Sequence, residues 1–383
     1  MTTHHVVILG AGAAGTAAAR TLVGSDGIAT TIIGRTDETP YTRMLIKGVA
    51  FGLTAPELIR LPMPHTDFVA DSAERVDIEA REVHLASGAT ITYDSLIVAT
   101  GSRARSLDVT VAGAGQASRA GKLIALHSLD DAVRIRDAIL ACAKPARIAI
   151  YGAGLTASET ASALQADGHQ ISLIARSKIP GVATFGRSVA ERIASDHRAR
   201  VSTFFGRTIS SIHSEPDATV VTLDDATNLT VDFVIIALGT TPLAPAPWDE
   251  EVVVDDRLRM LGFDNAYAAG GIAVHHDDYL GTWRIDHWDD AAAQGTHAAQ
   301  MVLHSVRLGE DPGAYRPRSA YMAMIYGRMI SGVGFTGLPD TGIDGADEFI
   351  VLHEYGDALV GASGIDAVGA VYQWGQHLHE VYF

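Results

Sequence analysis

Residues 6–15 read VVILGAGAAG, and this stretch decides the fold of the first part of the chain. Four apolar residues that run into glycines are typical of a buried strand followed by a tight turn and a helix. In this pattern Gly10 permits the turn, Gly12 lets backbone N–H groups approach a pyrophosphate, and Gly15 lets the helix pack on the strand. Because a helix N-terminus favours anions, the stretch predicts a dinucleotide site.

The same pattern occurs again in residues 147–157, which read RIAIYGAGLTA, with Gly152 and Gly154 at the first two glycine positions. Each copy is followed by a helical stretch and by another apolar strand, over residues 30–33 and 171–174. Unbroken apolar strands are expected in a parallel sheet that helices cover on both faces. We therefore predict an α/β fold with two Rossmann-like dinucleotide-binding domains and a small C-terminal α/β domain.

Glycine turns and proline-containing linkers predict the domain boundaries. A buried strand ends in a glycine turn at residues 96–101 and again at residues 234–239, and three prolines follow within residues 242–247. Such prolines are typical of a chain that crosses between domains. We predict a first, discontinuous domain over residues 1–110 and 240–312, a second domain over residues 111–239, and a C-terminal module over residues 313–383.

The charge balance argues against a nucleic-acid partner. Lys and Arg number 29 against 45 Asp and Glu, which gives a net charge of −16. An acidic surface repels phosphate backbones. The one local concentration of basic residues is Arg307, Arg316, Arg318 and Arg328. It is either a docking patch for an acidic protein or a set of scattered solvated charges.

The chain has a single cysteine, Cys142, so an intramolecular disulfide is impossible. We interpret Cys142 as a small buried residue of an alanine-rich helix. No apolar stretch reaches the roughly 18 residues that a membrane span needs. We expect a soluble cytoplasmic protein, monomeric or homodimeric. Histidines at positions 275, 276, 287, 377 and 379 lack cysteine support and helical spacing, so no metal site is predicted.

Several motifs carry a family resemblance. The sequence resembles the flavoprotein reductases of the pyridine nucleotide-disulfide oxidoreductase superfamily, and within them the FAD-dependent reductases that serve [2Fe–2S] ferredoxins of oxygenase systems. The motifs are the residue 10–15 loop, PYTR at 40–43 with Lys47, ATG at 99–101, GAG at 152–154 with Glu159, AAG at 268–270, DHWD at 286–289, QG at 294–295 and LVGA at 359–362.

The resemblance implies that FAD binds the first domain and NAD(P) the second. It implies that the nicotinamide lies over the flavin, that a hydride passes to flavin N5, and that a ferredoxin takes the electrons. It places Arg43 and Lys47 beside the flavin, Lys47 near N5, and Glu159 near the nicotinamide. It also aims the helix that begins near His287 at flavin N1 and O2. The alternatives are a solvated helix lysine for Lys47, a surface ion pair for Arg43 and a favourable charge in the first helical turn for Glu159.

The resemblance assigns catalytic roles to Lys47 and Glu159 and cofactor binding to a larger set. The predicted cofactor-binding residues are Gly10, Gly12, Ala14, Gly15, Arg35, Arg43, Lys47, Val76, Thr100, Gly101, His127, Gly152, Gly154, Leu155, Thr156, Glu159, Arg176, Lys178, Gly239, Gly270, Gly271, His287 and Trp288.

Several positions depart from the family pattern. Arg35 and Arg176 stand where an acid usually binds a ribose. Because a guanidinium binds a 2′-phosphate that a carboxylate would repel, Arg176 with Lys178 favours NADPH over NADH. Gly271 replaces an acid that relatives use on the flavin's ribityl chain. His127 replaces an arginine, and Met322 an aromatic residue near the flavin. These departures suggest weakened or reshaped FAD binding.

The leading hypothesis is an NAD(P)H-oxidising flavoprotein that reduces a ferredoxin-type partner. One cysteine is too few for a disulfide reductase, and none stands at residues 44–47, where peroxide-reducing relatives carry one. Two alternatives stay open. One is a flavin oxidase or reductase that acts on oxygen or a small organic substrate. The other is a dinucleotide-binding partner subunit without redox activity.

Overall fold

The structure is a computed structural model that describes residues 3–142, 144–152, 154–215, 218–248, 251–278, 281–337, 340–344, 349–356 and 358–379. The chain forms two compact units. Unit 1 comprises Met1–Thr42, Ile59–Arg103 and Thr240–Pro317, and unit 2 comprises Arg43–Leu58, Ala104–Gly239 and Arg318–Phe383. The predicted division into three parts stays a prediction. In the compact units, residues 43–58 and the C-terminal residues belong to the same unit as the second glycine motif.

Unit 1 is built on a parallel sheet with the strand order β19-β7-β1-β2-β3. The strands are β1 (His4–Leu9), β2 (Ile28–Gly34), β3 (Asp67–Ala70), β7 (Ser95–Val98) and β19 (Ala266–Ala268). The apolar run at residues 6–9 has no exposed surface, as expected for a central strand with neighbours on both sides. The first predicted βαβ unit is therefore confirmed.

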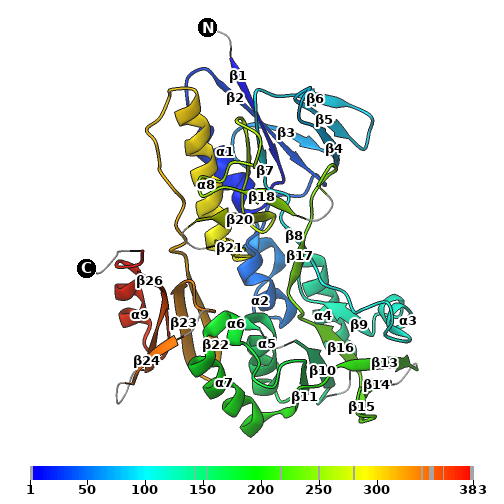
Figure 1. The fold of residues 1–383 in the computed structure, drawn as a ribbon. Helices are drawn as coiled ribbons and strands as arrows, with labels where there is room; N and C mark the ends of the chain where they lie inside the picture. Colours follow the sequence, from blue (N-terminus) through cyan, green and yellow to red (C-terminus); the bar gives the residue numbers. More distant parts are fainter. Residues whose placement is uncertain are drawn as a thin grey trace. The chain divides into compact units, whose positions relative to one another are not determined.

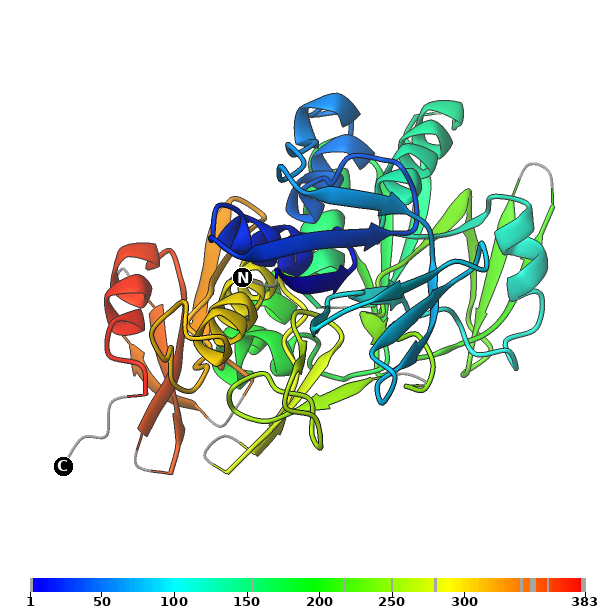
Figure 2. The ribbon, with the colours of Figure 1, turned by 90° about the horizontal axis from the view of Figure 1, so that it is seen from above.

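Two helices of unit 1, α1 (Ala13–Leu22) and α8 (Trp288–Ser305), pack side by side (Figures 1 and 2). Small residues allow this close approach. A Cβ atom on Gly295 would lie 2.0 Å from the backbone oxygen of Ala14, so no larger residue fits there. Helix α8 begins one residue after His287, where the sequence predicts a helix start.

Smaller elements complete unit 1. One antiparallel sheet contains β4 (Ala73–Asp77), β5 (Glu82–Leu85) and β6 (Thr90–Thr92), and a second sheet contains β18 (Val252–Val254), β20 (Ala273–Asp277) and β21 (Gly281–Trp283). The short strands β8 (Ser102–Ala104) and β17 (Thr240–Pro242) pair where the chain passes between the units, and η2 (Pro56–Ile59) stands at another such passage.

Unit 2 repeats the architecture with a parallel sheet in the order β12-β11-β10-β16-β9. Its strands are β9 (Leu123–Ala125), β10 (Arg147–Tyr151), β11 (Gln170–Ala175), β12 (Ser202–Phe205) and β16 (Phe233–Ile236). Its helices are α3 (Ala114–Arg119), α4 (Leu129–Ala141), α5 (Leu155–Ala166), α6 (Val182–Phe185) and α7 (Arg187–Arg200). An antiparallel sheet holds β13 (Ile209–Ser214), β14 (Thr219–Leu223) and β15 (Asn228–Val231). The second βαβ unit is thus confirmed.

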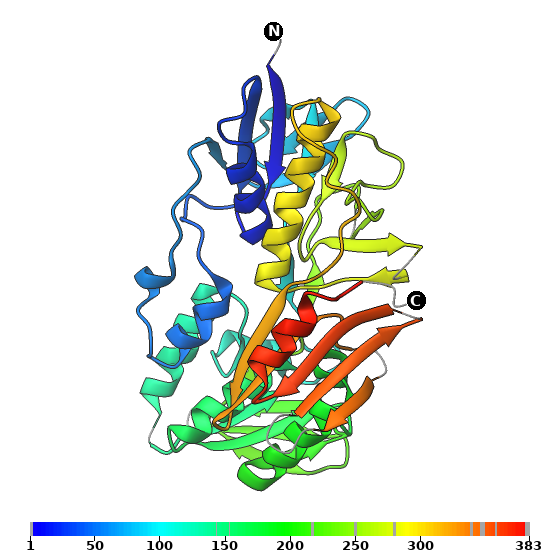
Figure 3. The ribbon, with the colours of Figure 1, turned by 90° about the vertical axis from the view of Figure 1, so that its left-hand side faces the viewer.

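Two further segments belong to unit 2. The segment η1 (Arg43–Leu45) and α2 (Ile46–Ala50) packs against α4. The C-terminal segment forms an antiparallel sheet in the order β22-β23-β26-β25-β24, with α9 (Val368–Gly375) against β23 and β26 (Figure 3). Its strands are β22 (Ala320–Ile325), β23 (Arg328–Gly334), β24 (Asp340–Asp344), β25 (Phe349–Tyr355) and β26 (Ala358–Ile365).

The prediction for Cys142 is wrong. Helix α4 ends at Ala141, and Cys142 follows in extended conformation with a partly exposed side chain. Pro145 fits this end, because a proline lacks the N–H that would bond to the carbonyl of residue 141 in a continued helix and its ring clashes with that carbonyl. Burial of part of the side chain raises the pKa of the Cys142 thiol. Among the described residues, no helix combines the length and apolar character that a membrane span requires.

Candidate functional site

The first glycine motif forms a cradle between β1 and α1. Gly10 has φ +105°, and a Cβ atom there would lie 2.3 Å from the Ala99 backbone oxygen. A Cβ on Gly15 would lie 1.9 Å from the Gly10 oxygen, whereas a Cβ on Gly12 would meet no atom within 4 Å. The loop is therefore closed on the protein side and open at its middle glycine. This shape fits a pyrophosphate, as FAD would require.

The second glycine motif has the same geometry between β10 and α5. Gly152 has φ +133°, and its Cβ would lie 2.0 Å from the Ala237 backbone oxygen. A Cβ on Gly154 would approach only the Thr184 hydroxyl, at 3.8 Å. Leu155 and Thr156 are the first two residues of α5. Unit 2 thus presents an open loop at a helix N-terminus, which fits the pyrophosphate of a nicotinamide dinucleotide.

A third turn lies beside the first cradle, after β19. Gly270 has φ +79°, and a Cβ there would lie 3.1 Å from the Cβ atoms of both Ala14 and Ala291. The turn is therefore enclosed by the first turns of α1 and α8, which both favour negative charge. The Gly270 N–H donates to the Gln294 side chain at 2.7 Å. His287 is the N-cap residue of α8 and Trp288 is its first residue. That this helix is directed at the flavin stays a prediction.

The two predicted catalytic residues contact each other within unit 2. The Lys47 ammonium donates a hydrogen bond to the Glu159 carboxylate, and these side chains are 22% and 16% exposed. Burial raises the pKa of Glu159, although the Lys47 charge and the Met324 backbone N–H both oppose that shift. Lys47 is thus not a solvated lysine. Glu159 is the fifth residue of α5, so the alternative of a charge in the first helical turn is wrong.

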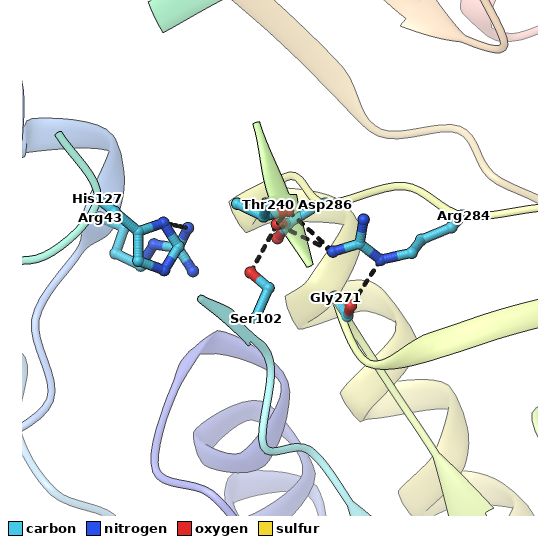
Figure 4. A network of polar contacts seen from close by, with 7 residues as sticks. All are labelled: Arg43, Ser102, His127, Thr240, Gly271, Arg284 and Asp286. Atoms are coloured by element: carbon cyan, nitrogen blue, oxygen red, sulfur yellow. Dashed lines mark hydrogen bonds and ion pairs between the residues drawn. The ribbon is translucent and has the colours of Figure 1, made fainter. Parts of the chain in front are cut away.

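Arg43 and His127 form a second pair in unit 2. The Arg43 Nη2 atom lies 3.0 Å from His127 Nδ1, so the arginine donates and Nδ1 accepts (Figure 4). The partner of Arg43 at this contact is an imidazole nitrogen, and its place beside the flavin stays a prediction. His127 directly precedes the Ser128 cap of α4. His127, at the position where the resemblance leads us to expect an arginine, is therefore a partner of Arg43.

A polar network in unit 1 contains residues that the sequence reasoning missed. Ser102 donates to the Asp286 carboxylate at 2.7 Å, and Thr240 also donates to it (Figure 4). Arg284 reaches the same carboxylate at 3.3 Å and the Gly271 carbonyl oxygen at 2.7 Å. Asp286 belongs to the DHWD motif at residues 286–289, and Gly271 is the feature of the sequence that could have pointed to a carboxylate nearby.

The remaining predicted residues are distributed over both units. Thr100 and Gly101 lie two and three residues after the end of β7, at the edge that carries the first cradle, and Thr100 donates to the Leu243 carbonyl. Val76 is buried in β4, and its backbone N–H donates to the Ala246 carbonyl oxygen at 2.7 Å. Gly239 has φ +80° and accepts a hydrogen bond from the Arg105 N–H.

The arginines at the two ribose positions are exposed. Arg35 follows the last residue of β2, and Arg176 follows the last residue of β11. The Lys178 side chain runs over Gly206, where a Cβ would lie 3.2 Å from Lys178 Cγ. Arg176 and Lys178 thus present two cations at the carboxyl end of β11. This arrangement fits a 2′-phosphate.

The other candidate groups divide between packing and surface. Trp283 is buried and stacks on His275 at 3.5 Å between ring centroids. Met322 is 53% exposed on β22. Within the described residues, no three potential metal-ligating side chains gather. Among the four clustered arginines, Arg316 and Arg318 donate to backbone oxygens, and Arg328 pairs with Asp366.

A buried polar cluster in unit 2 was not predicted. His197 of α7 is fully buried, with Nδ1 2.9 Å from the Tyr326 hydroxyl and Nε2 3.1 Å from the Ser158 hydroxyl. Burial lowers the pKa of His197 to about 4. The Tyr326 N–H also donates to Ser162 at 2.7 Å. The cluster therefore fixes the β22–β23 turn to α5 and α7.

Comparisons with known proteins agree with this geometry. The family model described as pyridine nucleotide-disulphide oxidoreductase matches residues 4–295. The rubredoxin-NAD(+) reductase of Pseudomonas putida is 26% identical, covering 86% of this chain and 86% of its own. The ferredoxin–NAD(+) reductase subunit of the benzene 1,2-dioxygenase system of Pseudomonas putida is 24% identical, covering 78% of this chain and 74% of its own.

Solved structures share the fold. A chain of the covalent putidaredoxin reductase–putidaredoxin complex has a TM-score of 0.86 at 22% identity, over 98% of this chain and 93% of that chain. An engineered water-forming NADPH oxidase bound to NADPH has a TM-score of 0.79 at 19% identity, over 97% of this chain and 90% of that chain. At three consecutive positions the oxidase carries engineered alanine, arginine and serine.

Proposed function

The chain belongs to the pyridine nucleotide-disulphide oxidoreductase family, and we propose that it is an FAD-dependent reductase that oxidises NAD(P)H and reduces a ferredoxin-type [2Fe–2S] protein in the cytoplasm. The doubled cradle carries this proposal. In each unit, a strand carbonyl excludes any side chain at the first glycine, and the middle glycine stays open. Two such loops give one chain the means to hold two dinucleotides.

Each unit has a separate task in this proposal. The cradle of unit 1, with the N-termini of α1 and α8, binds the FAD pyrophosphate and favours negative charge on the flavin. The cradle of unit 2 binds the nicotinamide dinucleotide. FAD, when bound, supplies the carrier that accepts a hydride and releases electrons to the acceptor. The protein positions and orients the two dinucleotides.

Lys47 and Glu159 position the nicotinamide in this proposal. Glu159 lies one helical turn beyond the N-terminus of α5, roughly 6 Å along the axis from Leu155. Its half-buried carboxylate accepts hydrogen bonds from Lys47 and the Met324 N–H. An acceptor held in this way can also bind the amide group of a nicotinamide. The ion pair keeps the local net charge near zero, so neither group is buried as a single charge.

The acceptor is a ferredoxin-type protein in this proposal. The relatives named above include a ferredoxin reductase, and one structural neighbour is named for its complex with putidaredoxin. A single cysteine gives this chain no dithiol of its own, so electrons leave the flavin directly.

NADPH is the preferred donor in this proposal. Arg176 and Lys178 supply cations at the end of β11, and no acid stands there. The residues 175–177 read Ala-Arg-Ser, the same three residue types that the engineered NADPH-bound oxidase carries at consecutive positions. The relatives named above are NAD(+) enzymes. The proposed preference for NADPH over NADH is therefore the point at which this chain differs from the relatives named above.

An absorption experiment tests the proposal. The purified protein, supplied with FAD, is titrated anaerobically with NADPH and then with NADH. We expect a bound flavin spectrum that bleaches with NADPH, and recovery of the oxidised spectrum when oxidised [2Fe–2S] ferredoxin is added. A protein that takes up no FAD would refute the proposal. Fast peroxide formation in air without a protein acceptor would favour the oxidase alternative, and dinucleotide binding without bleaching would favour the inactive partner subunit.

A further inference from the structure

The carboxylate of Asp286 lies at a place where three segments of unit 1 meet. It accepts hydrogen bonds from Ser102 after β7, from Thr240 at the start of β17 and from Arg284 after β21 (Figure 4). Its side chain is 19% exposed. Two donors from distant parts of the sequence, together with Arg284 two residues away, therefore fix the carboxylate in one position while part of it stays accessible.

Asp286 fills the space that a side chain at position 271 would take. A Cβ atom on Gly271 would lie 2.7 Å from Asp286 Oδ1 and 3.1 Å from its Cγ. Gly271 does not have a positive φ, so its backbone accepts any residue. The contact with Asp286 is thus what excludes a side chain there. Arg284 strengthens the arrangement, because it donates to the Gly271 carbonyl at 2.7 Å and also contacts Asp286.

The position of this carboxylate points to its ligand. Gly271 follows the carboxyl end of β19, and β7 and β1 are the next strands in the same parallel sheet. Ligands of open α/β sheets bind at the carboxyl ends of the strands. The first glycine cradle, which fits a pyrophosphate, follows β1. A carboxylate accepts hydrogen bonds from sugar hydroxyls, and the ribityl chain of FAD carries such hydroxyls between its pyrophosphate and its flavin.

We propose that Asp286 binds the hydroxyl groups of the FAD ribityl chain, and so supplies from the segment before α8 the carboxylate that position 271 lacks. This inference rests on the proposed function, because it requires FAD in unit 1. It predicts that one carboxylate is required at this place and that two are harmful. Positions 271 and 286 should therefore be exchangeable as its source.

Binding of FAD to the apoprotein tests the exchange. The variants are Asp286→Ala, Gly271→Asp and the double variant, with Asp26→Ala as the matched control. Asp26 is an exposed acid in the turn between α1 and β2, at the end of the sheet opposite the carboxyl ends of the strands. Affinity is measured by the quenching of flavin fluorescence. We expect about 10–100-fold weaker binding for each single variant, recovery to within about 3-fold in the double variant, and no change for the control.

A flavin analogue gives a second readout that does not depend on turnover. The analogue is an FAD with methylene groups in place of the ribityl hydroxyls. The wild-type protein should bind it about 10–100-fold more weakly than FAD. The Asp286→Ala variant should bind the analogue and FAD with equal affinity. Asp286→Asn keeps the size of the side chain and serves if the alanine variant unfolds.

The outcomes separate the two proposals. A wild-type protein that binds no FAD refutes the proposed function. A wild-type protein that binds FAD, with Asp286 variants equal to the Asp26→Ala control, overturns this inference alone. A double variant that binds no better than the single variants also overturns it, provided that thermal unfolding shows the apoprotein to be folded.

Discussion

Arg176 is an exposed residue that directly follows the last residue of β11. In a dinucleotide-binding unit, the side chain at this position distinguishes a ribose 2′-hydroxyl from a 2′-phosphate. We expect Arg176→Asp to lower kcat/KM for NADPH by about 10–100-fold, because it replaces a charge-assisted hydrogen bond to phosphate with repulsion. Activity with NADH should hold or rise, since a carboxylate there accepts the ribose hydroxyl. The ratio of kcat/KM for the two donors is the measurement.

The control for this variant is Arg187→Ala, which removes an exposed arginine of the same unit that pairs with Glu191. It should leave the donor ratio unchanged. If the wild-type enzyme prefers NADH and Arg176→Asp leaves the ratio of kcat/KM for NADPH and NADH unchanged, the proposed preference for NADPH is refuted.

Single residues show how far the sequence alone reaches. Gly10 and Gly152 were predicted, because a local motif of a few residues determines their conformation. The contact between Lys47 and Glu159 was not predicted, since 112 positions separate them in the chain. The role of Asp286 was missed for a similar reason. The sequence shows that an acid is absent at position 271, but only the folded chain shows which side chain occupies that space.

At the scale of elements, one histidine connects α7, α5 and the β22–β23 turn. His197 is neutral in the folded protein until the pH falls to about 4, its pKa there, because burial opposes its charge. In the unfolded chain an ordinary histidine takes up a proton near pH 6.5. Stability from this group is therefore present above about pH 6.5 and is lost between about 6.5 and 4.

We expect His197→Gln to flatten this acid dependence. The difference in unfolding free energy between wild type and variant should change by up to about 3 kcal/mol between pH 6.5 and pH 4. Urea unfolding across that range is the measurement. His213→Gln, at a side chain that is 75% exposed, is the control and should follow wild type. Parallel curves for wild type and His197→Gln would contradict the prediction.

Elements were predicted well where one stretch of sequence determines them. Apolar runs that end in glycine identified β1, β7, β10 and β16, because buried central strands leave no place for polar residues. The end of α4 was placed too late, since the effect of Pro145 on the preceding residues was overlooked. The grouping of residues 43–58 with the second βαβ unit depends on packing between α2 and α4, which no local pattern shows.

At the scale of the whole molecule, the two cradles should be separable by substitution. Gly10→Ala places a Cβ against the Ala99 oxygen, and Gly152→Ala places one against the Ala237 oxygen. We expect the first variant to lose FAD and keep nicotinamide binding. The second should keep the flavin spectrum, bleach with dithionite and fail to bleach with NADPH. Absorption spectra and calorimetry with NADP⁺ measure both effects.

Alanine variants at two other glycines with positive φ serve as controls, because they show how much backbone strain alone destabilises the protein. Gly24 (φ +86°) and Gly121 (φ +69°) have no atom within 4 Å of a Cβ position. Gly24→Ala and Gly121→Ala should therefore cost only about 1 kcal/mol of backbone strain and leave both dinucleotides bound. Loss of both dinucleotides in either cradle variant would mean that the sites do not function separately.

The chain passes between its two units five times, after Thr42, Leu58, Arg103, Gly239 and Pro317. No single break in the gene therefore separates one unit from the other, because the segments of the two units alternate along the chain. To move one unit alone into another protein, a rearrangement would have to cut the gene at all five boundaries and rejoin the segments of that unit. We expect ancestry to record this restriction: phylogenies calculated separately from the residues of each unit should have the same branching order.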